Sequence, residues 1–529
     1  MRDIAAILPA LALLTAAAVT ATPAVFPASA SPAAPVPAAP TSAASPAAPV
    51  PDAALGTASP DTPVVAAPDT PVVAAPNTPV AAAPAIRMPG GAPGANGTFV
   101  AFSDLHFNPF FDPLLVAELV RARSERWRAI FERSTVTSVG GYGQDSSYRL
   151  LKSTLAAAAS FAPRPDFVLI TGDFLGHHFP ALFAKHAPGA SQAAYRRFVL
   201  KTMRFVTAMI HEAYPRARVI PALGNNDSDC GDYALPGSSP FLARLEQLWR
   251  PLLGAAPGSF ARTFAAGGFY SLPHPTVRHV QVAVLDTVLF SPKYQACGHG
   301  RDMSAPQLQW LEAILRRASR QGDKVWLIYH VPPGIDAYAT LAAKGACRGA
   351  AVSLWQAGDL SRFLDLLARY PGVVTAAFAG HTHMDEIRLP AGAGFIHVTP
   401  AVSPLFGNNP GFAVFSYAPA SGAVADARTY YLDLAATGAG AGRWAMEYDF
   451  QEAYGQPGID GATLRAVQQA IAADPTVRGR YMTYYPVSSA GGRADLAHWQ
   501  AYWCAAQAFT PASFADCYCP AAAPAAPMR

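Results

Sequence analysis

The sequence lacks the features that mark several classes of protein. It has no run of lysine and arginine interleaved with aromatic residues, and a net charge of +4 is small for 529 residues. Composition therefore predicts no nucleic-acid-binding surface. The six cysteines contain no two CxxC pairs, which argues against a structural zinc site. The apolar stretch from Ile4 to Val19 is shorter than the roughly 20 residues of a membrane-spanning helix.

The first 95 residues have too little large apolar surface to form a core. Residues 1–30 are interpreted as a secretory signal peptide, because Arg2 precedes the apolar stretch and small residues follow it. Residues 31–95 are interpreted as a disordered Ala/Pro-rich linker with three octapeptide repeats related to PDTPVVAA. We therefore expect a secreted or periplasmic protein. The linker would be a tether to the cell envelope or a plain spacer, so peripheral membrane contact stays open.

The rest of the chain alternates apolar runs with helical patterns. Short apolar runs predict buried strands at residues 99–102, 167–170, 219–223, 325–329 and 373–378. Apolar residues at helical spacing predict helices at residues 148–161, 192–213, 305–321 and 360–369. Later β-rich segments predict a sheet edge at residues 394–399, 412–417 and 428–434. The pattern indicates an α/β domain over residues 96–440 and a helical, cysteine-containing C-terminal subdomain over residues 441–529.

Each predicted buried strand is followed by groups that bind metals. These groups are residues 104–106 (DLH), 172–173 (GD), 224–227 (GNND), His330 and 380–383 (GHTH). Strand ends are where α/β folds place their chemistry. Two divalent ions can bind the oxygens of a phosphoester and activate the water between them. Such a centre needs a bridging carboxylate together with nitrogen and oxygen donors.

The metal ligands can be assigned from this chemistry. Asp173 is predicted to bridge the two ions, because an aspartate after a strand and a glycine projects into the cleft with little obstruction. The other predicted ligands form two sets, Asp104, His106 and His383 for one ion and Asn225, His330 and His381 for the other. Zinc suits the histidine-rich sets best, and manganese or iron would use the same donors.

This order of groups resembles the calcineurin-like metallophosphoesterases, whose pattern is DxH, GD, GNH[DE], a single H and GHxH. Residues 329–334 (YHVPPG) and 399–412 (TPAVSPLFGNNPGF) are similar to the acid sphingomyelinase-like branch, and the resemblance extends from Phe99 to about Leu434. It implies a four-layer sandwich of two mixed β-sheets flanked by helices, with a small helical C-terminal subdomain. It also implies hydrolysis of a phosphodiester, sphingomyelin-like or nucleotide, by a metal-bridging hydroxide.

Two catalytic residues follow from the resemblance. The branch has a histidine four positions after the bridging aspartate that orients or protonates the leaving group, and His177 stands at that spacing. Asn226 replaces the histidine of the family's GNH[DE] motif. An amide can donate a hydrogen bond to a developing oxyanion, but it cannot supply a proton near neutral pH. Acid catalysis would then depend more on His177.

Alternatives remain open at this stage. The GNND motif looks like that of endopolyphosphatases, and no cysteine-rich saposin-like module precedes the predicted domain, so cleavage of phosphoanhydrides is a second hypothesis. A catalytically inactive metal-binding protein is a third. We expect a small phosphoester or polyphosphate as substrate and no stable protein partner. The even number of cysteines in an exported chain predicts disulfides, with fifteen possible pairings.

Overall fold

A computed structural model describes most of the chain from residue 96 onward. The described residues are 96–235, 239–254, 258–297, 302–343, 347, 350–436, 442–489, 494 and 496–519. The predicted signal peptide and linker lie outside the described residues, so both stay predictions. No helix within the described part is long and apolar enough to cross a membrane.

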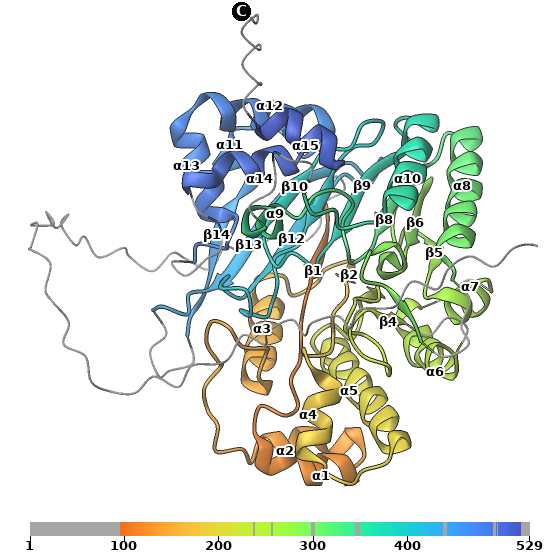
Figure 1. Cartoon of the computed structure of the whole chain (residues 1–529), viewed down its shortest axis with the longest axis vertical. Coiled ribbons are helices and arrows are strands. Elements are labelled where there is room, and N and C mark those ends of the chain that lie inside the picture. Colours follow the sequence, from red (N-terminus) through yellow and green to blue (C-terminus); the bar gives the residue numbers. More distant parts are fainter. Residues whose placement is uncertain are drawn as a thin grey trace, which may run out of the picture. The chain divides into compact units, whose positions relative to one another are not determined.

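The first sheet has six strands, most of them labelled in Figure 1. Three of the predicted ligand groups follow its strands. Its strands, in spatial order, are β14 (Trp444–Asp449), β13 (Val424–Leu432), β12 (Gly411–Tyr417), β1 (Gly97–Phe102), β2 (Phe167–Ile170) and β3 (Arg218–Pro221). β1, β2 and β3 run parallel, and the other neighbouring pairs are antiparallel. The parallel strands therefore end at one edge of the sheet.

The second sheet also has six strands. In spatial order they are β10 (Glu386–Arg388), β11 (Ile396–Val398), β9 (Val374–Ala379), β8 (Lys324–Ile328), β6 (Val280–Val284) and β5 (Tyr270–Pro273). The four central strands are parallel, whereas β10 and β5 pair antiparallel at the two edges. A separate parallel pair joins β4 (Ala234–Leu235) to β7 (Gln295–Ala296).

The two sheets pack face to face through aromatic side chains. The ring of Phe99 on β1 lies 4.8 Å from Phe415 in the same sheet. It also lies 5.6 Å from Trp326 and 5.2 Å from Phe378 in the other sheet. Such offset and edge-on contacts between rings stabilise a core beyond the burial of apolar area. The space between the sheets is thus filled and not available to a substrate.

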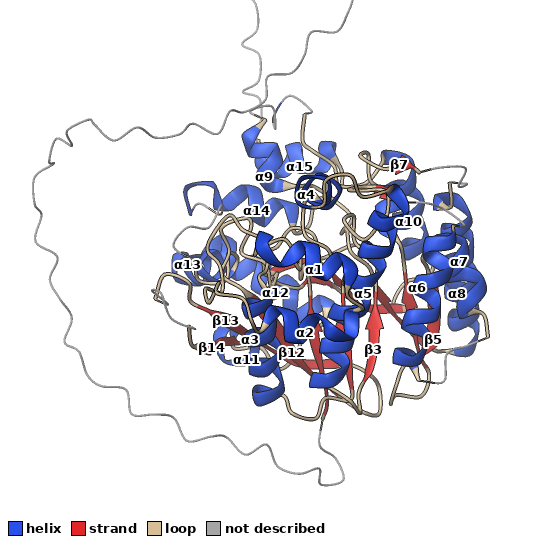
Figure 2. Ribbon diagram, turned by 90° about the horizontal axis from the view of Figure 1, so that it is seen from below, coloured by secondary structure: helices blue, strands red, loops and turns tan. Residues whose placement is uncertain are grey.

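Helices cover the outer faces of both sheets (Figure 2). On the first sheet, Phe161 of α3 (Tyr148–Phe161) stacks on Tyr430 at 4.3 Å, and α5 (Gln192–Ala213) packs beside α3. On the second sheet, α8 (Ser304–Gln321) and α10 (Ala357–Arg369) bury a separate apolar cluster against β6, β8 and β9. Both faces of β8 are buried, which explains its unbroken apolar run. The fold is the predicted four-layer sandwich.

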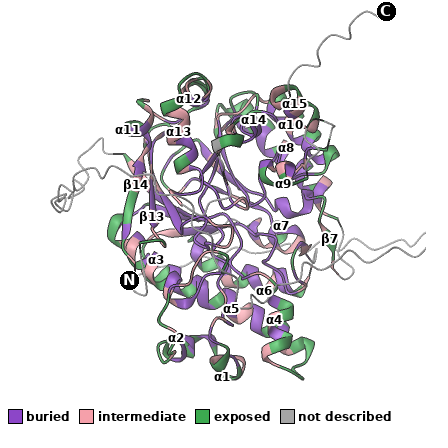
Figure 3. Cartoon of the chain, turned by 60° about the vertical axis from the view of Figure 1, so that its left-hand side comes forward, coloured by how far each residue is buried: buried purple, intermediate pink, exposed green. Residues whose placement is uncertain are grey.

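The remaining helices are short. They are α1 (Val116–Arg121), α2 (Trp127–Phe131), α4 (Phe179–His186), α6 (Pro240–Trp249), α7 (Phe260–Gly267), α9 (Ala337–Ala342), α11 (Phe450–Tyr454), α12 (Gly461–Ala473), α13 (Pro475–Tyr484), α14 (Trp499–Ala505) and α15 (Pro511–Tyr518). Exposed residues gather on the outward faces of the helices, and the strands are mostly buried (Figure 3).

One sequence expectation about the C-terminal region differs from the structure. The tail after about residue 442 was expected to be helical, but β14 is a strand that pairs with β13 in the first sheet. Only its buried Trp444 and Tyr448 face inward, so the segment carries little apolar signal. The helical part begins with α11, and the division into domains at residue 440 stays a prediction.

All six cysteines form disulfides, as expected from their even number. Cys230 pairs with Cys297, Cys347 with Cys519, and Cys504 with Cys517. The Cys347–Cys519 bond spans 172 residues and fastens the end of α15 to the loop after α9. The helical C-terminal region is therefore covalently attached beside a loop of the second sheet.

Candidate metal centre

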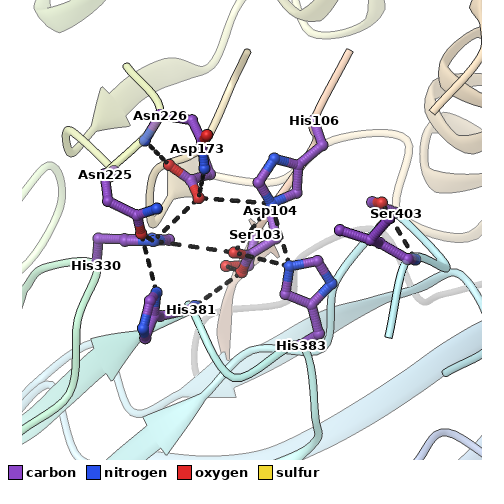
Figure 4. Close-up of polar contacts among 12 residues, drawn as sticks. Ser103, Asp104, His106, Asp173, Asn225, Asn226, His330, His381, His383 and Ser403 are labelled. Atoms are coloured by element: carbon purple, nitrogen blue, oxygen red, sulfur yellow. Dashed lines mark hydrogen bonds and ion pairs between the residues drawn. The ribbon is translucent and has the colours of Figure 1, made fainter. Parts of the chain in front are cut away.

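The predicted ligand groups meet at the carboxyl ends of five strands, one group from each (Figure 4). β1, β2 and β3 of the first sheet and β8 and β9 of the second supply them, because these parallel strands end at the same side of the sandwich. The ligand atoms of Asp104, His106 and His383 lie within 4.8 Å of one another, as do those of Asp104, Asp173 and His330. Residues far apart in the sequence thus form one cluster.

Asp173 has one carboxylate oxygen between the two predicted ligand sets. Its Oδ2 lies 3.4 Å from Nε2 of His106 and 3.3 Å from Nε2 of His330. Its Oδ1 accepts a hydrogen bond from the backbone N–H of Asn226 at 2.8 Å. Oδ1 is therefore held by the backbone, and Oδ2, which also accepts from the side chain of Asn226, lies where a bridging ligand would be.

The two carboxylate oxygens of Asp104 also lie in different environments. Oδ2 accepts hydrogen bonds from the Ser103 hydroxyl and from the backbone N–H of His381, the latter at 2.9 Å. Oδ1 is buried without a hydrogen-bond partner in the described part of the chain, 3.5 Å from Nε2 of His383 and 3.6 Å from that of His106. A buried carboxylate oxygen without a partner is costly unless a cation neutralises it.

The second ligand set is arranged around the amide of Asn225. Its Oδ1 lies 2.9 Å from Nε2 of His330 and 2.9 Å from Nδ1 of His381. Its Nδ2 donates to the Asp232 carboxylate at 2.7 Å, which turns the amide oxygen toward the two histidines. Sequence reasoning missed Asp232, because no motif includes it.

Several histidines are held by a second hydrogen bond at the other ring nitrogen. Nδ1 of His106 donates to the carbonyl of Leu175 at 3.0 Å, and Nδ1 of His330 donates to that of Thr171 at 2.9 Å. These bonds hold the proton on Nδ1 and turn Nε2 toward the cluster. Nε2 of His381 instead lies 3.2 Å from the Tyr233 hydroxyl. Such outer contacts are typical of histidines that bind metals.

The backbone at the ligands is strained. Asp104, His106, Asp173, His381 and His383 have φ values of 48°, 39°, 57°, 78° and 67°. Residues with a side chain rarely adopt this left-handed region, and each such residue costs on the order of 1–3 kcal/mol. Strain concentrated on five predicted ligands indicates that the fold holds them for a function and not for stability.

Asp227 joins the two loops that carry Asp173 and Asn225. Its carboxylate accepts four backbone hydrogen bonds, from Asp173, Phe174, Leu175 and Gly224, at 2.8 to 3.1 Å. Gly224 allows this close approach, since a Cβ there would lie 2.1 Å from Oδ1 of Asp173. The final aspartate of the GNND motif thus fixes the loops.

The charges favour binding of cations. Burial alone would raise the pKa of the Asp104 and Asp173 carboxyls, but the neighbouring histidines hold both pKa values below the usual range. Burial lowers the pKa of His381 to about 3 and that of His383 well below its usual value. Burial would also lower the pKa of His106 and His330, but the neighbouring carboxylates raise these values to about 10 and about 9, so both imidazoles would release a proton on binding a metal. Ionised carboxylates and neutral imidazoles are the forms that ligate metals. The donor set, the unpartnered Asp104 oxygen and the burial all fit two divalent ions.

His177 lies beside the cluster and has an acidic partner. Its ring centroid is 4.0 Å from that of His106, and its Nδ1 lies 2.9 Å from Oδ1 of Asp145. The backbone N–H of His177 also donates to Asp145 at 2.8 Å. Sequence reasoning assigned no role to Asp145, which stands 32 positions before His177 and outside any motif.

Asn226 lies against Asp173. Its Nδ2 donates to Oδ2 of Asp173 at 2.9 Å, and Asn226 is not among the residues that line the adjoining cavity. The amide therefore contacts the predicted bridging ligand in this structure. Its predicted contact with a developing oxyanion stays a prediction.

A cavity of about 310 Å³ opens on the cluster. Asp173, Asn225, His381 and His383 form its floor, and His177 lies in its wall. The other lining residues come from distant segments and are mainly aromatic or charged, including Tyr233, Lys293, Asp336, Tyr338, Phe406, Tyr485 and Tyr502. A small substrate that reaches the cluster must pass these side chains.

A buried ion pair connects the ligand loop of residues 380–383 to this cavity wall. Glu386 accepts from Arg388 Nη2 at 2.6 Å and from the Thr382 hydroxyl at 3.2 Å. Arg388 also donates to the carbonyl of Pro333 at 2.8 Å. Thr382 stands between the two predicted ligand histidines, so the Glu386–Arg388 ion pair stabilises their loop. No sequence pattern predicted this pair.

Metal-dependent phosphoric ester hydrolases bind their ions with carboxylates, an amide and imidazoles that converge where two facing sheets end. The protein is an enzyme of this class. The chain belongs to the calcineurin-like phosphoesterase family, whose model matches residues 97–385.

Curated relatives place the chain in a branch of this family. It is 30% identical to acid sphingomyelinase-like phosphodiesterase 3b of Homo sapiens, over 79% of this chain and 89% of that protein. It is 28% identical to cyclic GMP-AMP phosphodiesterase SMPDL3A of Rattus norvegicus, over 75% of this chain and 86% of that protein. Among solved structures, a dimetal phosphatase from Danio rerio is 14% identical with a TM-score of 0.34, and the match covers 66% of this chain and 98% of that one. The predicted acid sphingomyelinase-like branch is confirmed by the curated relatives.

Proposed function

We propose that the protein is an exported phosphodiesterase that uses two divalent metal ions. The position of Asp173 Oδ2 between Nε2 of His106 and Nε2 of His330 carries this proposal. Asp104, His106 and His383 would hold one ion and Asn225, His330 and His381 the other, with Asp173 shared. Zinc is the ion that we expect, since four of the seven ligands are imidazoles.

When bound, the ions supply Lewis acidity at the phosphoryl oxygens and activate a water molecule. The protein's own groups hold the substrate and move the proton. His177 would donate a proton to the leaving oxygen, because it faces the cavity beside His106 and Asp145 fixes its ring. Asp145 accepts at Nδ1, which leaves Nε2 as the atom that gives up the proton.

Export is supported by the cysteines. All six are paired, and disulfides persist mainly in secreted, periplasmic or cell-surface proteins. The signal peptide proposed for residues 1–30 agrees with this location. Mass spectrometry of the mature N-terminus after expression in a bacterial host would test it, and an intact Met1 in the exported protein would contradict it.

Two substrate classes are supported by separate observations. The names of the relatives favour a phosphodiester, either sphingomyelin-like or a nucleotide. Asn226 in the GNND motif favours a phosphoanhydride, since the leaving phosphate of an anhydride needs less help from an acid than an alkoxide does.

Product analysis on one panel of substrates tests the proposal. The metal-loaded protein would be given sphingomyelin, ATP, long-chain polyphosphate and the activated diester bis(p-nitrophenyl) phosphate. We expect cleavage of the activated diester, and a loss of at least about a thousandfold in Asp173→Asn, together with lower metal content. Binding of two metal ions without cleavage of any substrate would identify an inactive metal-binding protein and overturn the proposal.

A further inference from the structure

The cavity beside the metal centre carries an ammonium group that the proposed reaction does not use. Lys293 lines the same cavity as Asp173, Asn225, His177 and His381, and its side chain is exposed. Among the described residues it makes no ion pair. A solvated lysine in a cavity that receives an anionic substrate is placed to contact it.

The position of Lys293 is fixed by the elements around it. Its Nζ lies 5.1 Å from the centre of the Tyr233 ring, a favourable cation–π distance. The Tyr233 hydroxyl contacts Nε2 of His381 at 3.2 Å, so one aromatic ring separates the ammonium from a predicted metal ligand.

The loop that carries Lys293 is fastened to the loop of Asn225. The backbone N–H of Gln295 donates to the carbonyl of Tyr233 at 2.9 Å, and that of Tyr233 donates to the carbonyl of Asn225 at 2.8 Å. The Cys230–Cys297 disulfide closes the same connection covalently. Lys293 is thus held at a defined place relative to the metal centre, although its own side chain reaches into solvent.

The two carboxylates in this part of the cavity already have other partners. Asp232 accepts from Nδ2 of Asn225 at 2.7 Å, and Asp336 accepts from the backbone N–H of Ala339 at the start of α9 at 2.9 Å. Lys293 therefore remains the group available to a second negative charge on the substrate.

We propose that Lys293 forms a subsite for a second phosphate group, next to the phosphate that is cleaved at the metal centre. This inference rests on the proposed function and narrows its substrate class. A lysine is a point charge that attracts phosphate, and it repels the quaternary ammonium of a phosphocholine group. Both a nucleoside triphosphate and inorganic polyphosphate carry such a neighbouring phosphate.

The test compares Lys293→Met with wild type on four substrates. ATP and inorganic tripolyphosphate carry a second phosphate, bis(p-nitrophenyl) phosphate carries none, and p-nitrophenyl phosphocholine carries a cation. Lys293→Arg restores the charge. Lys185→Met is the matched control, because Lys185 is an exposed lysine of α4 that does not line the cavity.

We expect kcat/KM of Lys293→Met on ATP and tripolyphosphate to fall about tenfold more than on the two nitrophenyl diesters, mainly through KM. The difference should shrink at high salt, since an exposed charge is screened. Lys293→Arg should recover most of the loss. An equal loss on ATP and tripolyphosphate would support a subsite for phosphate itself, whereas a loss on ATP alone would overturn the inference.

Binding provides a readout apart from turnover. Tripolyphosphate should bind the wild-type holoprotein more tightly than Lys293→Met by calorimetry, with Lys185→Met like wild type. Equal losses on all four substrates, or unchanged affinity for tripolyphosphate, would overturn the inference. If wild type cleaves the diesters but neither binds nor cleaves the anhydrides, the inference fails and the proposed function stands.

Discussion

The floor and the far wall of the cavity are built in opposite ways. The floor consists of predicted ligands at the ends of buried strands; three of the four have left-handed backbones, and three of the four are buried. The far wall comes from α9 and the helical C-terminal region, including Asp336, Tyr338, Tyr485 and Tyr502. The Cys347–Cys519 disulfide fastens these two segments to each other.

This difference separates the chemistry of the enzyme from its selectivity. The strand ends hold the ligands in one strained arrangement, which suits a reaction that tolerates little displacement of its groups. The wall is made of segments whose side chains differ in charge and size, so we expect it to select the leaving group. Substitutions in the floor should therefore lower kcat on all substrates that are cleaved by the same reaction. Substitutions in the wall should instead alter KM for particular substrates.

The largest effect on turnover is expected from a substitution of His177, which lies in the cavity wall beside the floor. His177→Ala should lower kcat by about 10²- to 10⁴-fold on a diester with an alkoxide leaving group, because the proposed general acid is lost. The same variant should lose little on bis(p-nitrophenyl) phosphate, whose nitrophenolate leaves without a proton. His178→Asn is the control, since His178 is exposed and asparagine tolerates its left-handed backbone. Full turnover of the alkoxide diester by His177→Ala would remove the acid role.

The attachment of the wall can be broken without touching the floor. The double variant Cys347→Ser/Cys519→Ser opens a loop of 172 residues and should lose about 2–5 kcal/mol of stability in denaturant unfolding. Opening the 13-residue loop of Cys504→Ser/Cys517→Ser should lose less, because the closure entropy is smaller. We expect the first variant to raise KM more than it lowers kcat. A fall in kcat at unchanged KM would contradict the division between floor and wall.

The smallest effect on stability and metal binding is expected at Thr382, where floor and wall meet. Thr382→Val removes the hydroxyl that donates to Glu386 and should cost about 1 kcal/mol. Since Thr382 stands between His381 and His383, the change should weaken metal affinity severalfold in a chelator competition. Thr382→Ser keeps the hydroxyl and should behave like wild type. Unchanged affinity in Thr382→Val would show that the Arg388–Glu386 pair serves stability alone.

The sequence predicted the floor better than the wall. Helices α3 and α5 occur at the predicted residues, because Ser147 and Ser191 cap them and their apolar periodicity is strong. The strands that carry the ligands were also predicted within a few residues. β5, β6 and β14 were not predicted. β5 is short and β14 is weakly patterned, so both gain stability from their neighbours, whereas β6 carries an apolar run that the prediction overlooked.

The residues that hold the predicted ligands and His177 in place could not be predicted either, and the reason is different. Asp145, Asp232 and Arg388 belong to no motif, and each meets its partner only after the chain has folded. Single charged residues in loops look alike in a sequence, whether they face solvent or a catalytic histidine. Only three-dimensional contacts distinguish them.

The sequence by itself determined the chemistry of this protein: strands that end in aspartate, asparagine and histidine specify metal ligands, because residue type fixes what an atom can bind. The tertiary structure decided how the oxygens of Asp104 and Asp173 divide between protein and cluster, which cysteines pair, and which side chains surround the substrate. These features depend on distances between segments far apart in the chain, such as the 277 residues that separate Asp104 from His381. Such distances are set by packing of the two sheets and not by local pattern.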